Sequence, residues 1–154
     1  MKYHQPQEFR VVSLRECPTP AKLMLVDTPE RAVAYWRRHV TAAPWYNPDV
    51  ECAVVLLVNA RHRAIGHVLV GVGTLDSVTI HARDVFRAAI VCGQAYGVVI
   101  MHCHPSGDPD PSAPDITISR QLERAGRLLN IPLLDSIIIG HPRKFRSLRA
   151  MNCL

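Results

Sequence analysis

Residues 97–115 read GVVIMHCHPSGDPDPSAPD, an apolar run that passes directly into two histidines, a proline-rich loop and an aspartate. The apolar run is short and rich in β-branched residues, which predicts a buried strand at 97–102. The prolines and the glycine after it prevent a regular element. A helix is expected to begin near Ser112 and to carry Asp115 in its first turn. The segment therefore predicts a strand, a loop and a helix start in succession.

The flanking sequence supplies the remaining elements. Apolar residues at helical spacing predict helices at 82–96 and from 112 to Leu129. Short apolar runs predict strands at 133–139 and 144–148. The apolar run at 51–58 and a second run that ends at Val70 predict an antiparallel hairpin. Val85, Ala89, Cys92 and Tyr96 mark the first helix, and Ile118, Leu122, Ala125 and Leu129 the second. This order indicates an α/β fold, with helices packed on a mixed sheet.

The first 48 residues differ from the rest, and two prolines near position 45 interrupt any regular element. We expect an N-terminal extension at 1–48 with one helix, and a main domain at 49–154. Thr28 suits the N-cap of that helix, which would run to about Val40 with Val33, Trp36 and Val40 on one face. Residues 8–14 could form a strand.

The two histidines have the spacing of metal ligands. Successive side chains of an extended segment point to opposite faces, so His102 and His104 can address one point while Cys103 points away. Asp115, one turn into the following helix, can supply a third ligand. Two imidazoles and one carboxylate leave the fourth tetrahedral position of zinc open to water, as in catalytic sites.

A structural interpretation of the same residues stands beside this one. Ser112 and Asp115 also form a good capping box, and a pair of histidines beside a loop usually binds nothing. The joint pattern His-x-His-x7-Ser-x2-Asp would arise by chance on the order of one time in a thousand. Capping and metal binding are compatible, because a cap would fix the helix start that carries Asp115.

This pattern resembles the JAMM metalloproteases, also called JAB or MPN+, and within them the bacterial RadC-like proteins, whose loop commonly reads His-Asn-His-Pro-Ser-Gly-Asp. The likeness covers about residues 49–148. It implies a JAB1/MPN-like (cytidine deaminase-like) architecture, zinc held by His102, His104 and Asp115, Glu51 as general base and Ser112 as a helper at the scissile carbonyl. The implied reaction is cleavage of a peptide or isopeptide-like amide by a zinc-activated water.

Some positions leave alternatives open or depart from the family. Glu51 could be a solvated carboxylate at a strand start, and Ser112 could be a helix cap only. Cys103 replaces the usual asparagine, with a structural role or sensitivity to oxidation as its consequence. Ser136 stands where relatives usually have histidine. The upstream helix-hairpin-helix region of many RadC-like proteins has no match in residues 1–48, which weakens the DNA-repair association of the family.

Composition limits the class of protein. Eighteen Lys and Arg against thirteen Asp and Glu permit contact with nucleic acid, although scattered basic residues commonly form a solvated surface. Five cysteines without a C-x-x-C pair or disulfide-like spacing favour a reducing compartment. No run is long enough to cross a bilayer. We expect a cytoplasmic protein without a membrane partner.

Two hypotheses from different classes follow. The first is the zinc-dependent hydrolase, with a peptide or protein substrate. The alternative is a non-enzymatic module that binds DNA or protein and keeps a structural zinc site. The sequence predicts neither the identity of the substrate nor an oligomeric state.

Overall fold

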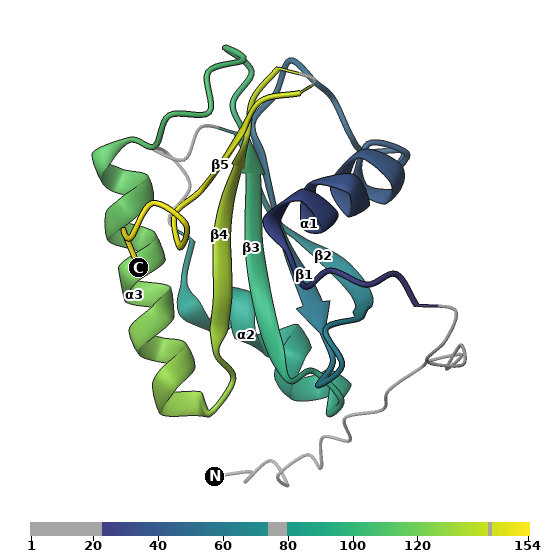
Figure 1. Ribbon diagram of the computed structural model, residues 1–154, viewed down its shortest axis with the longest axis vertical. Coiled ribbons are helices and arrows are strands. Elements are labelled where there is room, and N and C mark those ends of the chain that lie inside the picture. Colours follow the sequence, from purple (N-terminus) through teal and green to yellow (C-terminus); the bar gives the residue numbers. More distant parts are fainter. Residues whose placement is uncertain (1–22, 74–79, 142) are drawn as a thin grey trace, which may run out of the picture.

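The computed structural model describes residues 23–73, 80–141 and 143–154 (Figure 1). In chain order the described elements are α1 (Pro29–Tyr35), η2 (Trp36–Val40), β1 (Cys52–Val58), β2 (Ala64–Val72), α2 (Ala82–Cys92), β3 (Gly97–Cys103), α3 (Ala113–Leu129), β4 (Leu133–Ile139) and β5 (Phe145–Ser147). The strand expected at 8–14 lies outside the described residues. No helix in the described ranges is both long and apolar enough to cross a membrane.

The strands form one mixed sheet in the order β2-β1-β3-β4-β5. β1 pairs antiparallel with β2 and with β3, whereas β3 and β4 are parallel and are joined by α3. β5 pairs antiparallel with β4 at the edge. The predicted hairpin and the mixed α/β class are confirmed, and the architecture agrees with a JAB/MPN-like domain.

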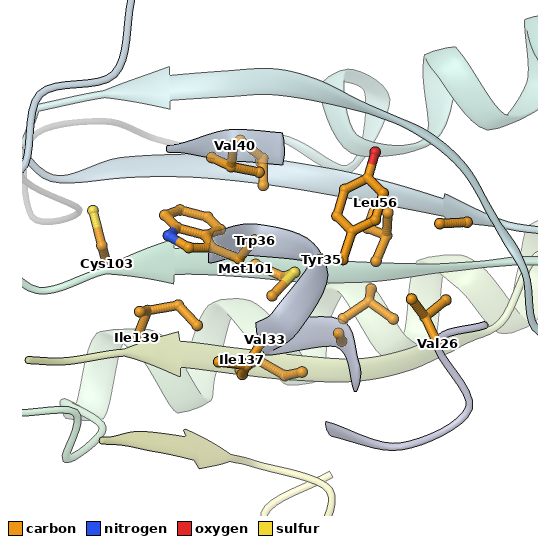
Figure 2. Packing of buried hydrophobic residues seen from close by; sticks show 14 of the residues in the cluster. Val26, Val33, Tyr35, Trp36, Val40, Leu56, Met101, Cys103, Ile137 and Ile139 are labelled. Atoms are coloured by element: carbon orange, nitrogen blue, oxygen red, sulfur yellow. The ribbon is translucent and has the colours of Figure 1, made fainter. Parts of the chain in front are cut away.

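Helices cover both faces of the sheet, which explains why β1 and β3 are buried along their whole length (Figure 1). On one face, α2 and α3 pack against a cluster that includes Ala53, Val98 and Ile100. On the other face, α1 and η2 pack against Val54, Met101 and Ile137, with Trp36 and Val33 over the middle of the sheet (Figure 2). Since side chains alternate along a strand, even-numbered positions of β3 face α3 and odd-numbered positions face α1.

The N-terminal helix follows its prediction closely. The Thr28 hydroxyl caps it by accepting a hydrogen bond from the Arg31 backbone N–H at 3.3 Å. Val33, Trp36 and Val40 are all buried, as predicted, although the last turn is π-helical. This helix contributes to the same core as the strands of the main domain. The division of the chain at residue 48 stays a prediction.

The predicted extents of two elements and the predicted burial of Leu129 were wrong. α2 ends at Cys92 because Gly93 adopts a left-handed conformation with φ 63°, which stops a helix. Tyr96 therefore lies beyond the helix and is 49% exposed. Leu129 is the last residue of α3. It was expected on the buried face of that helix, but it is 43% exposed. The final strand is shorter than expected, at Phe145–Ser147.

Candidate metal centre

The end of β3 brings two imidazoles together. His102 is the last even-numbered residue of the strand and faces α3, and His104 follows just beyond it. The backbone N–H of His104 donates to the carbonyl of Ile139 at 2.9 Å, which keeps the chain beside β4. As a result the Nε2 atoms of His102 and His104 lie 3.1 Å apart, as the alternation of the strand predicts.

Asp115 reaches the same point from the first turn of α3. Ser112 is the N-cap, and its Oγ accepts from the Asp115 backbone N–H at 3.2 Å. In return, Oδ2 of Asp115 accepts from the Ser112 backbone N–H at 2.8 Å and from its hydroxyl at 2.7 Å. This capping box fixes the Asp115 side chain, because two hydrogen bonds hold its carboxylate and a third holds its backbone N–H.

The Asp115 carboxylate faces both imidazoles and is almost fully buried. Oδ1 lies 3.3 Å from Nε2 of His102, and Oδ2 lies 3.6 Å from Nε2 of His104. Burial raises the pKa of Asp115, but the neighbouring imidazoles of His102 and His104 and the hydroxyl of Ser112 together hold it far below its usual range. Within the described part of the chain, Oδ1 is a buried oxygen without a hydrogen-bond partner. A buried carboxylate oxygen of this kind is well suited to bind a cation.

Glu51 enters the group from the neighbouring strand. It directly precedes β1, and because Ala53 pairs with His102, the start of β1 lies beside the end of β3. One ligand atom from each of Glu51, His102 and His104 lies within 4.8 Å of the others. These three half-buried or buried side chains could hold a metal ion.

The surroundings of His104 favour the tautomer that binds metal through Nε2. Its Nδ1 lies 2.8 Å from the carbonyl oxygen of Asp108. A carbonyl oxygen can only accept, so Nδ1 carries the proton and Nε2 of the neutral ring keeps its lone pair. The hydrogen bond with Asp115 raises the pKa of His104, against the effect of burial.

Two of the separations between these atoms are close to those around a tetrahedral ion. Zinc binds histidine nitrogen and carboxylate oxygen at about 2.0–2.2 Å, so two of its ligands lie roughly 3.3–3.6 Å apart. Nε2 of His102 lies 3.1 Å from Nε2 of His104 and 3.3 Å from Oδ1 of Asp115, whereas the 3.6 Å to His104 is measured from the other carboxylate oxygen, Oδ2. The donor set of two imidazoles and a carboxylate is also one that zinc accepts.

The residues that depart from the family pattern also have defined positions. Cys103 points away from this group, as predicted, and its Sγ lies 3.6 Å from that of Cys52. Ser136 is buried and shares a hydrogen bond of 2.8 Å with Ser119 of α3. At position 136, where the family resemblance implies a histidine, this chain therefore has a serine that pairs with Ser119.

A cavity of about 470 Å³ opens beside His104. Its walls come from η2, the segment before β1 and the turn after β4, and include Arg37, Tyr46, Asp49 and His141. No role was predicted for these four residues at this site, since no spacing in the sequence relates them. Their proximity depends on how η2 packs against the sheet, for which no local signal exists.

Comparison with known proteins is decisive for the family. The model of the RadC-like JAB domain matches residues 26–153. The chain belongs to the RadC-like JAB family. The match extends over helix α1 as well as the sheet, so it includes residues that precede the predicted domain boundary.

Individual relatives agree with this assignment. This RadC-like chain is 36% identical over 135 residues to a UPF0758 protein of Thermosynechococcus vestitus, covering 88% of this chain and 51% of the relative. It is 44% identical over 99 residues to one of Cyanothece, covering 64% and 40%. Over 86 residues it is 45% identical to one of Staphylococcus carnosus, covering 56% and 38%. The chain spans about half the length, or less, of these curated relatives.

Proposed function

We propose that this RadC-like domain is a zinc-dependent hydrolase that cleaves a peptide or isopeptide-like amide, with His102, His104 and Asp115 as the metal ligands. The observation that carries the proposal is the buried Oδ1 atom of Asp115, which lacks a hydrogen-bond partner within the described residues and lies 3.3 Å from Nε2 of His102. A buried carboxylate oxygen beside two imidazole nitrogens offers a cation a set of donor atoms in a site that is shielded from water.

Asp115 suits the ligand role better than Glu51 for a geometric reason. The carboxylate of Asp115 is held by the capping box and is within 3.6 Å of both imidazoles. The ligand atoms of Glu51 and of the two imidazoles all lie within 4.8 Å of one another. The capping box gives Asp115 the defined geometry that a metal ligand needs, and Glu51 is assigned the role of general base.

A zinc ion bound there would supply Lewis acidity and would lower the pKa of water toward about 7. In this proposal Glu51 accepts the proton of the attacking water and passes it to the leaving amine. Its location at the start of β1, opposite the ligand strand, gives it access to the group without tying it to the helix cap. Proton transfer of this kind contributes about 10²–10⁴-fold to the rate.

Ser112 is assigned a positioning role. Its hydroxyl group donates its single proton to a hydrogen bond with Oδ2 of Asp115, and the two oxygen atoms are 2.7 Å apart. A direct contribution at the scissile carbonyl would require that hydrogen bond to break. Ser112 therefore acts on the reaction through Asp115, by holding the carboxylate at the angle that presents Oδ1 to the metal.

In this proposal the substrate occupies the cavity that His104 lines, although Glu51, His102 and Asp115 are not among the lining residues. The cavity combines apolar walls, including Trp36 and Ile139, with the charged side chains of Arg37 and Asp49. Such a mixture suits a polypeptide segment, whose side chains contact the apolar part and whose backbone meets the polar part.

The test is a metal and activity measurement on three proteins. Wild type, His104→Ala and Glu51→Gln are purified, their zinc content is determined, and each is offered a library of peptides and isopeptide-linked conjugates. We expect zinc and hydrolysis in wild type, neither in His104→Ala, and zinc without hydrolysis in Glu51→Gln. Metal-free wild type that zinc does not reconstitute would overturn the proposal.

A DNA-associated or protein-binding module is the competing hypothesis, and the same samples examine it. Two basic side chains near the C-terminus form ion pairs on the protein surface: Arg146 pairs with Asp110 at 2.9 Å, and Arg149 binds Glu123 and the carbonyl of Leu133. This leaves less free positive charge than the sequence suggests. A salt-dependent gel shift that survives Glu51→Gln, with no hydrolysis by wild type, would favour the module.

A further inference from the structure

Cys52 and Cys103 face one another across two antiparallel strands. The register pairs Ala53 with His102, so the next pair toward the ends of the strands is Cys52 with Cys103. Both side chains are buried on the face that α1 covers, and their Sγ atoms lie 3.6 Å apart. The two cysteines are therefore in contact, although 51 positions separate them in the sequence.

The backbone at this pair already suits a disulfide. Directly opposite residues of antiparallel strands have Cα atoms about 4.5–5.5 Å apart. Disulfides span about 4.4–6.8 Å between Cα atoms. The sulfur atoms need to approach by roughly 1.5 Å to reach bonding distance, which side-chain rotation can supply without moving the strands.

A small oxidant can reach the pair through the cavity beside His104. Cys103 forms part of the lining of that cavity, together with Trp36 and Ile139. Figure 2 shows Cys103 at the end of β3, beyond Trp36. The cavity volume of about 470 Å³ exceeds that of a peroxide molecule many times over. Cys52, in contrast, is not among the residues that line this cavity.

We propose that hydrogen peroxide converts Cys52 and Cys103 into a reversible cross-strand disulfide, a modification site directly beside the candidate metal centre. The Cys103 sulfur attacks one peroxide oxygen, the O–O bond breaks, and the products are a sulfenic acid and water. The Cys52 sulfur then attacks the Cys103 sulfur, and the hydroxyl group leaves as a second water with the proton of Cys52. Two thiols lose two electrons and two protons, and one peroxide takes them up. A dithiol reverses the reaction and becomes a disulfide itself.

The location of the bond gives it a consequence, which rests on the proposed function. Cys103 lies between His102 and His104, and Cys52 follows Glu51. A disulfide here ties the strand end that carries the imidazoles to the strand start that carries the proposed base.

The experiment uses the full chain, reduced and then freed of reductant. Dilute protein is treated with an equimolar amount of hydrogen peroxide, blocked with a maleimide after denaturation, digested and analysed by mass spectrometry. We expect a Cys52–Cys103 linked peptide and the loss of two alkylatable thiols, which dithiothreitol restores. Peroxide that oxidises Cys153 while both Cys52 and Cys103 stay alkylatable would overturn the proposal. So would sulfinic acid on Cys103 without any linked peptide.

Two variants serve as controls. Cys52→Ser should abolish the linked peptide and leave Cys103 to be oxidised alone. A combined Cys92→Ser and Cys153→Ser variant should keep the linked peptide in full, because both of these cysteines lie outside the pair. If Cys52→Ser does not fold, the peptide map of wild type still decides. This readout measures a bond and not turnover, so its failure is distinct from a failure of the proposed hydrolase.

Discussion

Ser112 directs both its backbone N–H and its hydroxyl to the same carboxylate oxygen of Asp115, Oδ2, at 2.8 and 2.7 Å. The other oxygen, Oδ1, is thereby left facing His102 at 3.3 Å. One capping box thus performs two tasks, since it begins α3 and sets the direction of a proposed metal ligand. From the sequence, capping and metal binding were compatible interpretations of the same residues, and the geometry joins the cap and the proposed ligand in one arrangement.

Ser112→Ala separates the two tasks. It removes the hydroxyl that holds Oδ2, and loss of a supporting hydrogen bond to a ligand typically lowers metal affinity about 10–100-fold. Loss of the cap also costs about 1 kcal/mol of stability. Zinc affinity from competition with a chelating dye, and urea unfolding, measure the two effects.

Thr28→Ala is the matched control, because Thr28 caps α1 in a comparable way, at the start of a different helix. It should lower stability by a similar amount and leave zinc affinity unchanged. Equal zinc affinity in the Ser112→Ala and Thr28→Ala proteins would show that the capping box does not support the ligand.

Glu51→Gln should keep the zinc and lose the reaction. An amide cannot take up a proton as a carboxylate does, so turnover of any substrate found should fall by about 10²–10⁴-fold. Glu30→Gln, which neutralises an exposed glutamate of α1, is expected to behave as wild type. If Glu51→Gln loses its zinc instead, Glu51 is a ligand and the proposed division of roles is wrong.

Asp135 should make stability depend on pH. Burial raises its pKa, although hydrogen bonds from Ser147, Arg149 and Ser136 oppose the change. A carboxyl with a raised folded-state pKa binds more protons in the folded than in the unfolded state just above pH 4. The stabilisation that Asp135 contributes is therefore complete below about pH 4, the pKa of an aspartate in the unfolded chain. It is lost as the pH rises through the higher pKa that Asp135 has in the folded protein.

The check is urea unfolding of wild type and Asp135→Asn at a series of pH values from 4 upward. Asparagine can keep the two backbone hydrogen bonds that Oδ1 of Asp135 accepts, and it does not titrate. Wild type should lose stability relative to the variant as the pH rises. Parallel curves for the two proteins would contradict the raised pKa.

Gly126 permits α3 to pack closely on the sheet layer. A Cβ at this position would lie 2.6 Å from the carbonyl oxygen of Ile131 and 3.1 Å from Phe86. The resulting strain of about 1–3 kcal/mol should exceed the gain of about 1 kcal/mol in helix propensity, so Gly126→Ala should destabilise the protein.

Gly66→Ala provides the comparison for that substitution. No atom lies within 4 Å of a Cβ at Gly66 in β2, so the change should be neutral or slightly stabilising. Unfolding midpoints in urea distinguish the two variants. Equal stability of the two alanine variants would mean that α3 is free to shift away from the turn at Ile131.

Local patterns predicted a large part of this molecule. Alternation along β3 placed His102 and Cys103 on opposite faces, because the side-chain period of a strand is two and both faces are covered. The end of α2 was missed because apolar spacing continued to Tyr96, while the left-handed Gly93 had already ended the helix. Periodicity reports which face is apolar, and it says less about where an element stops.

Contacts between distant segments could not be predicted in this way. Cys52 and Cys103 have no informative spacing, and their contact follows from the register between β1 and β3. The cavity beside His104 likewise depends on η2 lying next to the turn after β4. Both features arise from tertiary packing, which brings together residues that no local pattern relates.

The central claim is that His102, His104 and Asp115 hold a zinc ion. The most direct measurement is an anomalous difference map, recorded at the zinc edge from crystals of the zinc-loaded protein. We predict one peak about 2.0–2.2 Å from Nε2 of His102, Nε2 of His104 and Oδ1 of Asp115. A peak bound by Glu51 in place of Asp115, or no peak between the two imidazoles, would contradict it.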